Sequence, residues 1–303
     1  MSGSLIRASV LRLSGAPLFR SLVDRSGIAS RFVAGETLGD ALEVARGLAN
    51  SSMRSMLDHL GENTITEEGA RAATQAYVEA ARATHADPAL DGAISLKLTQ
   101  LGLDLSYDLC RENAERILAE AGSTMVMLDM ESHPYTDRTL RLYGDLHGVH
   151  HSFGVCLQAY LRRTAADLDS LPPSSIIRLV KGAYLEPREL ALSSRQEVRR
   201  AFGSLFATLL ARGHRVHVAT HDPRLVERAR QFVEHHGLPW ERVEFQMLYG
   251  IRRDLQERLV AEGSPVRVYV PYGTEWYPYL TRRLAERPAN LWFFLSNLAR
   301  SPR

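Results

Sequence analysis

The chain has 303 residues, of which 45% are hydrophobic, and a formal net charge of +2. A near-neutral chain of this length can form one large core, for example a barrel of about 250 residues with an added segment, and its charge does not suggest nucleic-acid binding. Cys110 and Cys156 lie far apart without a CxxC motif, which indicates free thiols and no disulfide or zinc framework. No apolar run approaches the roughly 18 residues that a membrane span requires.

Residues 1–50 are interpreted as an N-terminal helical arm, with helical periodicity over Leu38–Leu48. The first 23 residues contain Arg7, Arg12 and Arg20 but no acidic residue, a composition that also occurs in targeting peptides. Because Arg12 interrupts the apolar part of this stretch, an amphipathic helix is favoured over a cleaved signal.

Residues 51–303 contain eight β-branched or apolar runs that alternate with helical patterns. The runs are Met53–Leu60, Ala93–Thr99, Thr124–Met130, Gly154–Tyr160, Ser175–Lys181, Arg215–Thr220, Val243–Leu248 and Val266–Val270. The helical patterns include Ser106–Ala121, Arg195–Arg212 and Pro223–His236. Eight β/α units predict an α/β fold, a closed parallel (β/α)8 barrel of the TIM type. The main alternative is a doubly wound open sheet, but no GxGxxG follows any run. The first run is the least secure, because it also fits a helix.

Polar residues occur at the ends of these runs, and the carboxyl ends of barrel strands are where active sites lie. Alternation places Ser95, Lys97 and Thr99 on one face of the second run. A lysine on the inner face of a barrel is costly without an anionic partner or a ligand. Asp129 is therefore the expected partner of Lys97 or of Arg178. The other polar residues at strand ends are Glu131, Gln158, Tyr160, Lys181, Tyr184, Thr220, His221, Gln246, Tyr269 and Tyr272.

Only two of the 37 basic residues are lysines, namely Lys97 and Lys181. A solvated surface accepts arginine or lysine equally, so the two lysines indicate positions that require a compact ammonium group, unless their retention is chance. After the eighth run, helical spacing places Tyr279 beside Arg282 and Arg283. Such an arginine pair can bind a carboxylate through bidentate hydrogen bonds, or it can simply belong to a solvated helix face.

Other residue groupings predict no metal site and no serine nucleophile. His147, His150 and His151 are close together in the sequence, but no further ligand lies at metal spacing. The G-x-S-x-G motif of serine hydrolases is also absent.

Seven short motifs occur in the order seen in proline dehydrogenases, from about residue 53 to residue 297. They are Ile-Ser-Leu-Lys-Leu-Thr, Leu-Asp-Met-Glu, Leu-Gln-Ala-Tyr, Arg-Leu-Val-Lys-Gly-Ala-Tyr, Ala-Thr-His, Glu-Phe-Gln-Met-Leu-Tyr-Gly and Tyr-Leu-Thr-Arg-Arg. The sequence therefore resembles this family, and its length resembles the short monofunctional members. Leu185 follows Tyr184 where many members have Trp, which questions one stacking contact but not the reaction.

The resemblance implies a distorted (β/α)8 barrel that holds FAD noncovalently. It implies oxidation of L-proline to Δ1-pyrroline-5-carboxylate, the first step of proline catabolism to glutamate, with electrons passed to a quinone. It also implies a cytoplasmic location with peripheral contact at the inner membrane, and the N-terminal arm is the membrane-binding element that the sequence offers for it. Carried over by motif, the expected site residues fall into three groups. The residues that bind the proline carboxylate or pack against the proline ring are Lys97, Leu248, Tyr269, Tyr279, Arg282 and Arg283. The catalytic residues are Asp129 and Arg178, and Arg178 also lies beside the flavin N5. The residues that contact FAD are Met130, Gln158, Lys181, Gly182, Ala183, Thr220 and His221.

The chemistry of the reaction suits these roles. Hydride loss beside the ring nitrogen leaves an iminium while the flavin gains negative charge, so a nearby cation stabilises the reduced cofactor. The amine must be neutral to release hydride, and no dedicated base is obvious. Two other functions stay open from the residues alone: a Schiff-base aldolase that uses Lys97 or Lys181, and a barrel kept only for binding.

Overall fold

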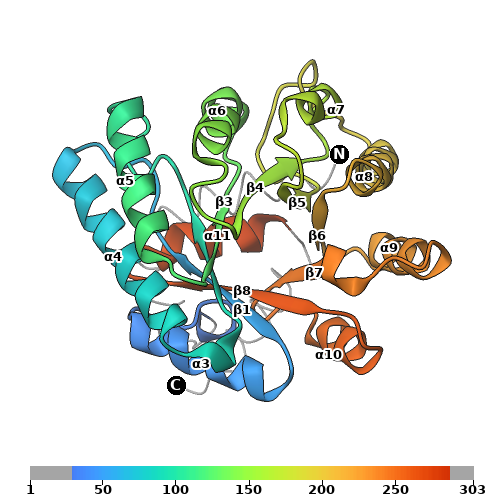
Figure 1. Ribbon diagram of the computed structural model, residues 1–303, viewed down its shortest axis with the longest axis horizontal. Coiled ribbons are helices and arrows are strands. Elements are labelled where there is room, and N and C mark those ends of the chain that lie inside the picture. The colour runs from blue at the N-terminus through green and yellow to red at the C-terminus, as the bar shows by residue number, and fades with distance from the viewer. Residues whose placement is uncertain (1–28, 287–303) are drawn as a thin grey trace, which may run out of the picture.

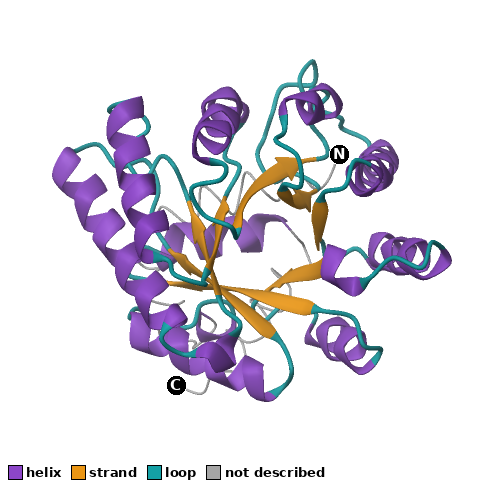
Figure 2. Cartoon of the chain, in the orientation of Figure 1, coloured by secondary structure: helices purple, strands orange, loops and turns teal. Residues whose placement is uncertain are grey.

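The computed structural model describes residues 29–286, and the side chains of residues 29–281. Eight parallel strands pair in sequential order and close into a barrel, with helices around it (Figures 1 and 2). The strands are β1 (Arg54–His59), β2 (Ala93–Leu96), β3 (Met125–Leu128), β4 (Phe153–Gln158), β5 (Ile176–Val180), β6 (Arg215–Ala219), β7 (Val243–Leu248) and β8 (Val266–Tyr272). The predicted closed barrel is thus confirmed and the open sheet is wrong. The first run, which also fitted a helix, is a strand paired with β2 and β8.

The helices agree with the predicted patterns to within about two residues at each end. In the second unit, Ser106 accepts a hydrogen bond from the Leu109 N–H group, so the helix begins one residue after it. The α-helices are α3 (Leu38–Asn50), α4 (Glu67–His85), α5 (Tyr107–Glu120), α6 (Thr136–Leu146), α7 (Thr164–Asp167), α8 (Arg195–Ala211), α9 (Pro223–His235), α10 (Arg253–Ala261) and α11 (Trp276–Glu286). Short 3-10 helices are η1 (Ala29–Arg31), η2 (Pro88–Leu90), η3 (His133–Tyr135), η4 (Leu168–Ser170) and η5 (Trp240–Arg242).

Alternation along the strands separates two packing environments. Outward residues such as Leu57 and Ile94 join the helices in the main hydrophobic core. Inward residues of β1, β2, β3 and β5 form a small separate cluster of Met56, Ala93, Met127 and Ile176. The second predicted run was too long: β2 ends at Leu96, and the chain turns immediately afterwards, so alternation does not extend to Thr99.

Helix α3 precedes the first β/α unit, and helix α11 follows β8 in the eighth. Helix α3 packs directly against β1 and β8, and it begins at a capping box formed by Thr37 and Asp40. Helix α11 crosses behind the ring of strands in Figure 1, while the other long helices lie around its outside. The division into an arm of residues 1–50 and a barrel of residues 51–303 stays a prediction. Its residues 1–28 lie outside the described residues.

The lower half of the barrel interior, near the amino ends of the strands, contains a buried charged cluster that was not predicted. Arg267 on β8 makes a two-point ion pair with Glu244 on β7, at 2.8 and 3.1 Å. Its Nη1 atom donates to the main-chain oxygens of Ser55 and Asp91. Burial alone would raise the pKa of Glu244, but the Arg267 guanidinium holds that pKa below its usual value. Beside them, burial lowers the pKa of His217 to about 4, so its ring is neutral at neutral pH.

We predict that His217→Asn makes the fold less sensitive to acid. A histidine whose folded pKa is depressed contributes stability above its unfolded pKa of 6.5, and loses it as the pH falls towards 4. Between these pH values the free energy of unfolding should fall by on the order of 3 kcal/mol less in the variant than in the wild type. Urea unfolding at stepped pH measures this difference, with His235→Asn at the exposed end of α9 as the control. Parallel curves for wild type and His217→Asn would contradict the prediction.

Candidate active site

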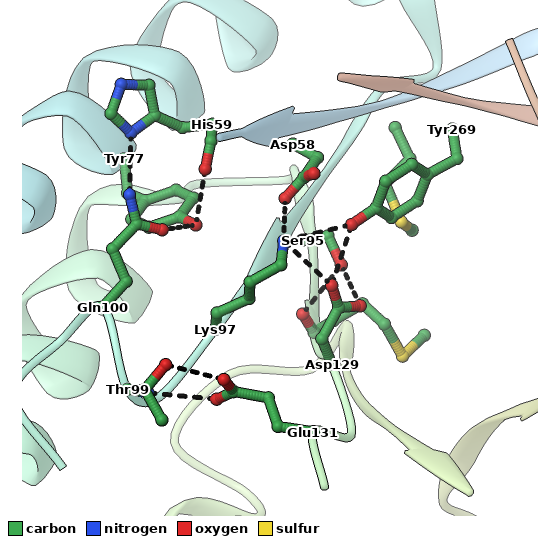
Figure 3. Close-up of polar contacts among 12 residues, drawn as sticks. Asp58, His59, Tyr77, Ser95, Lys97, Thr99, Gln100, Asp129, Glu131 and Tyr269 are labelled. Carbon is green, nitrogen blue, oxygen red and sulfur yellow. Dashed lines mark hydrogen bonds and ion pairs between the residues drawn. The ribbon is translucent and has the colours of Figure 1, made fainter. Parts of the chain in front are cut away.

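Lys97 lies just past the end of β2, between two carboxylates (Figure 3). Its Nζ atom is 2.5 Å from Asp58 Oδ1 and 3.4 Å from Asp129 Oδ2. The Tyr269 hydroxyl donates to Asp129 Oδ2 at 2.8 Å and lies 3.5 Å from Nζ. The lysine side chain is only 9% exposed, so the ammonium group depends on these oxygens for its stabilisation.

Arg178 on β5 reaches the same carboxylate from the other side of β3. Its Nη1 atom pairs with Asp129 Oδ1 and donates to Ser95 Oγ at 3.1 Å. Ser95 in turn donates to Asp129 Oδ1 at 2.7 Å. The guanidinium carbon is 5.3 Å from the centre of the Tyr269 ring, within the range of a cation–π contact. These contacts join four charged residues into one group, the charged quartet of Asp58, Lys97, Asp129 and Arg178.

Mutual pairing determines the ionisation of this charged quartet. Burial alone would lower the pKa of Lys97, but the Asp58 and Asp129 carboxylates hold that pKa well above its usual value. Burial would raise the pKa of Asp129, but Lys97 and Arg178 hold it below its usual value. For Asp58 burial is the larger effect, and the pKa of this carboxyl is raised.

Asp58 is the residue of this group that the sequence did not reveal. The expected partnership of Asp129 with Lys97 or Arg178 is found, and Asp129 contacts both. The closest contact of Lys97, however, is with Asp58 on β1. Alternation would have placed Asp58 on the inner face together with Met56, but the first run was too ambiguous to be interpreted in that way.

A second set of predicted residues lies along the ends of β4 to β7, which are neighbours in the barrel. The Gln158 amide donates to the Glu131 main-chain oxygen at 2.9 Å. Lys181 Nζ lies 3.8 Å from Asp222 Oδ2. On the next two strands, the Leu248 N–H group donates to His221 Nε2 at 2.9 Å, so these two residues are in contact. In this set Thr220 is also buried and Ala183 is exposed, whereas the predicted cofactor contact Met130 follows β3 and is buried.

Gly182 shows why this part of the chain requires a glycine. Its φ angle is +115°, in a region that L side chains rarely adopt. A Cβ atom there would also lie 2.2 Å from the Tyr160 ring. The Tyr160 N–H group donates to the Lys181 oxygen at 2.9 Å, so the end of β4 and the loop after β5 are joined at this point.

Three further predicted residues, Tyr279, Arg282 and Arg283, belong to α11. Tyr279 is buried in a cluster that joins α11 to Phe32, Val33 and Leu60, so its ring has a packing role. Its contact with a substrate ring stays a prediction. Arg282 and Arg283 belong to α11, but their side chains lie outside the described residues.

Glu131 was expected at the same rim as Asp129, but its carboxylate bonds elsewhere. It accepts hydrogen bonds from the Thr99 N–H and hydroxyl groups at 3.0 and 2.6 Å (Figure 3). It therefore fastens the turn after β2 to the loop after β3. Among the described residues, no group of three or more His, Cys, Asp or Glu could hold a metal ion.

Fold and site together define a (β/α)8-barrel protein with paired charges at the carboxyl ends of its strands, the arrangement found in barrel enzymes. A family model described as proline dehydrogenase matches residues 41–295. Proline dehydrogenase 2 of Bacillus subtilis is 38% identical over 275 residues, covering 90% of each chain. Proline dehydrogenase of Deinococcus radiodurans is 38% identical over 311 residues, covering 98% of this chain and 99% of the relative. The chain belongs to the proline dehydrogenase family, and it is an enzyme.

Solved structures support the same fold. The proline utilization A (PutA) protein of Bdellovibrio bacteriovorus, inactivated by N-propargylglycine, matches with a TM-score of 0.78 and 27% identity. The match covers 86% of this chain and 32% of the PutA chain, so this chain spans about a third of that protein. Within the described part of the chain, no helix has the length and apolar character to cross a bilayer.

We predict that Lys97→Met strongly destabilises the protein, by about 3 kcal/mol, because it leaves two buried carboxylates without their shared cation. Adding Asp58→Asn should recover part of this loss, since it removes one of the uncompensated charges. Urea unfolding of the three proteins measures both effects. Arg71→Met, which removes the exposed pair with Glu67, is the control and should cost less than about 1 kcal/mol. A double variant no more stable than Lys97→Met would contradict the shared pairing.

Proposed function

We propose that this enzyme oxidises L-proline to Δ1-pyrroline-5-carboxylate with noncovalently bound FAD, and that its electrons pass to a quinone. The observation that carries the proposal is the proximity of a buried charged quartet to the polar residues at the ends of β4 to β7. The charged quartet can hold a small charged amino acid. The polar residues at the ends of β4 to β7 can hold a large polar cofactor next to that amino acid.

The residues at the ends of β4 to β7 fit a flavin. The edge of a flavin ring presents mostly hydrogen-bond acceptors, and Arg178 and Lys181 are cationic donors on the same strand end. Gln158, Thr220 and His221 add side chains that can donate or accept. Bound FAD would supply the two-electron acceptor that the oxidation requires. The arginine would then lie where negative charge develops, which favours the reaction electrostatically.

Lys97, Arg282 and Arg283 are the proposed partners of the proline carboxylate, and Leu248, Tyr269 and Tyr279 are the proposed walls around its ring. The Tyr269 hydroxyl is already held by Asp129, so this ring is oriented before substrate binds. An enclosed pocket favours the neutral form of the substrate amine, which is the form that can release hydride. Orientation against the cofactor accounts for much of the remaining rate.

The charges argue against the Schiff-base alternative. A lysine that attacks a carbonyl must lose its proton, which requires a depressed pKa. The two neighbouring carboxylates have the opposite effect on Lys97 and raise its pKa. A protonated, ion-paired lysine suits carboxylate binding better than nucleophilic attack.

The proposed quinone and the proposed peripheral contact at the inner membrane are supported by two exposed apolar side chains. Ile65 follows β1 and Leu185 follows β5, and both lie on loops at the carboxyl end of the barrel, where the site is. Such side chains suit contact with an apolar acceptor or a lipid surface. The proposed location is cytoplasmic, with this peripheral contact at the inner membrane.

We predict that the purified protein contains FAD and that L-proline bleaches its visible absorption under anaerobic conditions. D-proline at the same concentration is the control for stereochemical recognition. An absorption spectrum before and after addition of each enantiomer is the measurement. A colourless protein that FAD does not reconstitute would overturn the proposed function.

Arg178→Met should slow the limiting rate of bleaching more than it weakens proline binding. The positive charge matters most as the cofactor becomes anionic, and loss of one such electrostatic contact typically costs about 10²- to 10³-fold. Stopped-flow absorption over a range of proline concentrations separates the limiting rate from the apparent affinity. Arg242→Met is the matched control. Within the described structure, this arginine bonds only to the main-chain oxygens of Leu210 and His214. An unchanged limiting rate in Arg178→Met would remove Arg178 from the proposed role.

A further inference from the structure

Gln246 lies inside the barrel on β7, between the buried charged cluster of the lower interior and the charged quartet of the site. Its side chain is almost completely buried. The amide oxygen accepts a hydrogen bond from Arg178 Nε at 2.8 Å. The amide nitrogen lies 2.8 Å from His217 Nδ1 and donates to Glu244 Oε1 at 2.9 Å.

These partners determine the orientation of the amide. A guanidinium group can only donate, so it must face the amide oxygen. An ionised carboxylate can only accept, and the pKa of Glu244 is held below its usual value by Arg267, so Glu244 must face the amide nitrogen. The second N–H of the amide points to His217, whose neutral ring accepts at Nδ1. Both N–H groups and the carbonyl oxygen of the Gln246 side chain are therefore used in one orientation.

The remaining contacts of Arg178 do not replace this one. Its Nη1 atom is used by Ser95 and Asp129, and its Nη2 atom contacts Met56 Sδ. The Nε atom controls the tilt of the planar guanidinium group. Among the described residues, this atom bonds only to Gln246. Glu244 is itself held by the two-point pair with Arg267. A continuous line of polar contacts thus runs from Arg267 on β8 to Arg178 at the site.

We propose that Gln246 is a positioning residue for the oxidation. Because it is itself held by Glu244 of the Glu244–Arg267 pair, its amide oxygen fixes the plane of the Arg178 guanidinium group. This inference rests on the proposed function for the role of Arg178. Gln246 itself does not contact the substrate, and its effect passes through Arg178. A role confined to stability would lower the melting temperature without a selective effect on the limiting rate.

The test is a double-mutant cycle with Gln246→Met and Arg178→Met. Gln246→Met should lower the limiting rate of bleaching at saturating proline by about tenfold, with the apparent KM for proline changed by less than about twofold. In the Arg178→Met background it should change the limiting rate by less than about twofold, because the group that it positions is gone. Asn113→Leu is the matched control: it removes a buried amide on α5 that bonds only the Leu101 oxygen in the described structure, and the limiting rate should not change.

A second measurement needs no cofactor. Urea unfolding of the four apoproteins in the cycle should show that the two substitutions are not additive, because both remove the same hydrogen bond. If Gln246→Met does not accumulate as folded protein, Gln246→Asn replaces it, since this variant keeps the amide but withdraws it from Arg178 by one methylene.

The outcomes separate the two proposals. Additive effects on both the rate and the unfolding free energy, or an unchanged limiting rate in Gln246→Met when Arg178→Met is slow, would overturn the positioning role alone. A wild-type protein that proline does not bleach would overturn the proposed function. In that case the unfolding cycle would still show whether Gln246 and Arg178 are coupled.

Discussion

The structure depends on one constraint: a charge enclosed in a barrel must be paired with another. Asp129 satisfies this for two cations at once, because Lys97 and Arg178 approach its two oxygens from different strands. Asp58 completes the group on the other side of Lys97. With both carboxylates ionised the charged quartet is neutral, so the cost of enclosing four charges is offset by close pairing.

Neutrality of this group has a consequence for substrate binding. A bound amino acid would bring a carboxylate into a region where the lysine charge is already balanced by Asp58 and Asp129. Further positive charge must therefore be provided for it. The adjacent arginines of α11, Arg282 and Arg283, are the residues proposed for this purpose, and the position of α11 across the ring of strands in Figure 1 suits that proposal.

The barrel interior is organised in two polar levels with an apolar layer beside them. The lower level contains Glu244 and Arg267, and the upper level is the charged quartet. Gln246 connects the two through hydrogen bonds whose direction is determined by its charged partners. The small apolar cluster around Met56 and Met127 packs against Tyr269, and Met56 also contacts Arg178. This arrangement lets buried polar groups hold a side chain rigidly, because an enclosed hydrogen bond has no competing water.

The sequence by itself determined the succession of eight β/α units and most of the strand ends that carry polar residues, because periodicity shows which face of a strand a side chain occupies. It also predicted that Lys97 faces the inside of the barrel and that Asp129 pairs with Lys97 or with Arg178, since enclosed charges of opposite sign must pair. Only the tertiary structure decided which of these groups meet. Strand register and barrel closure bring Asp58 to Lys97, although they are 39 residues apart, and they bring Gln246 to Arg178 across 68 residues. Periodicity contains no information about register between strands, so contacts of this kind arise only when the sheet closes.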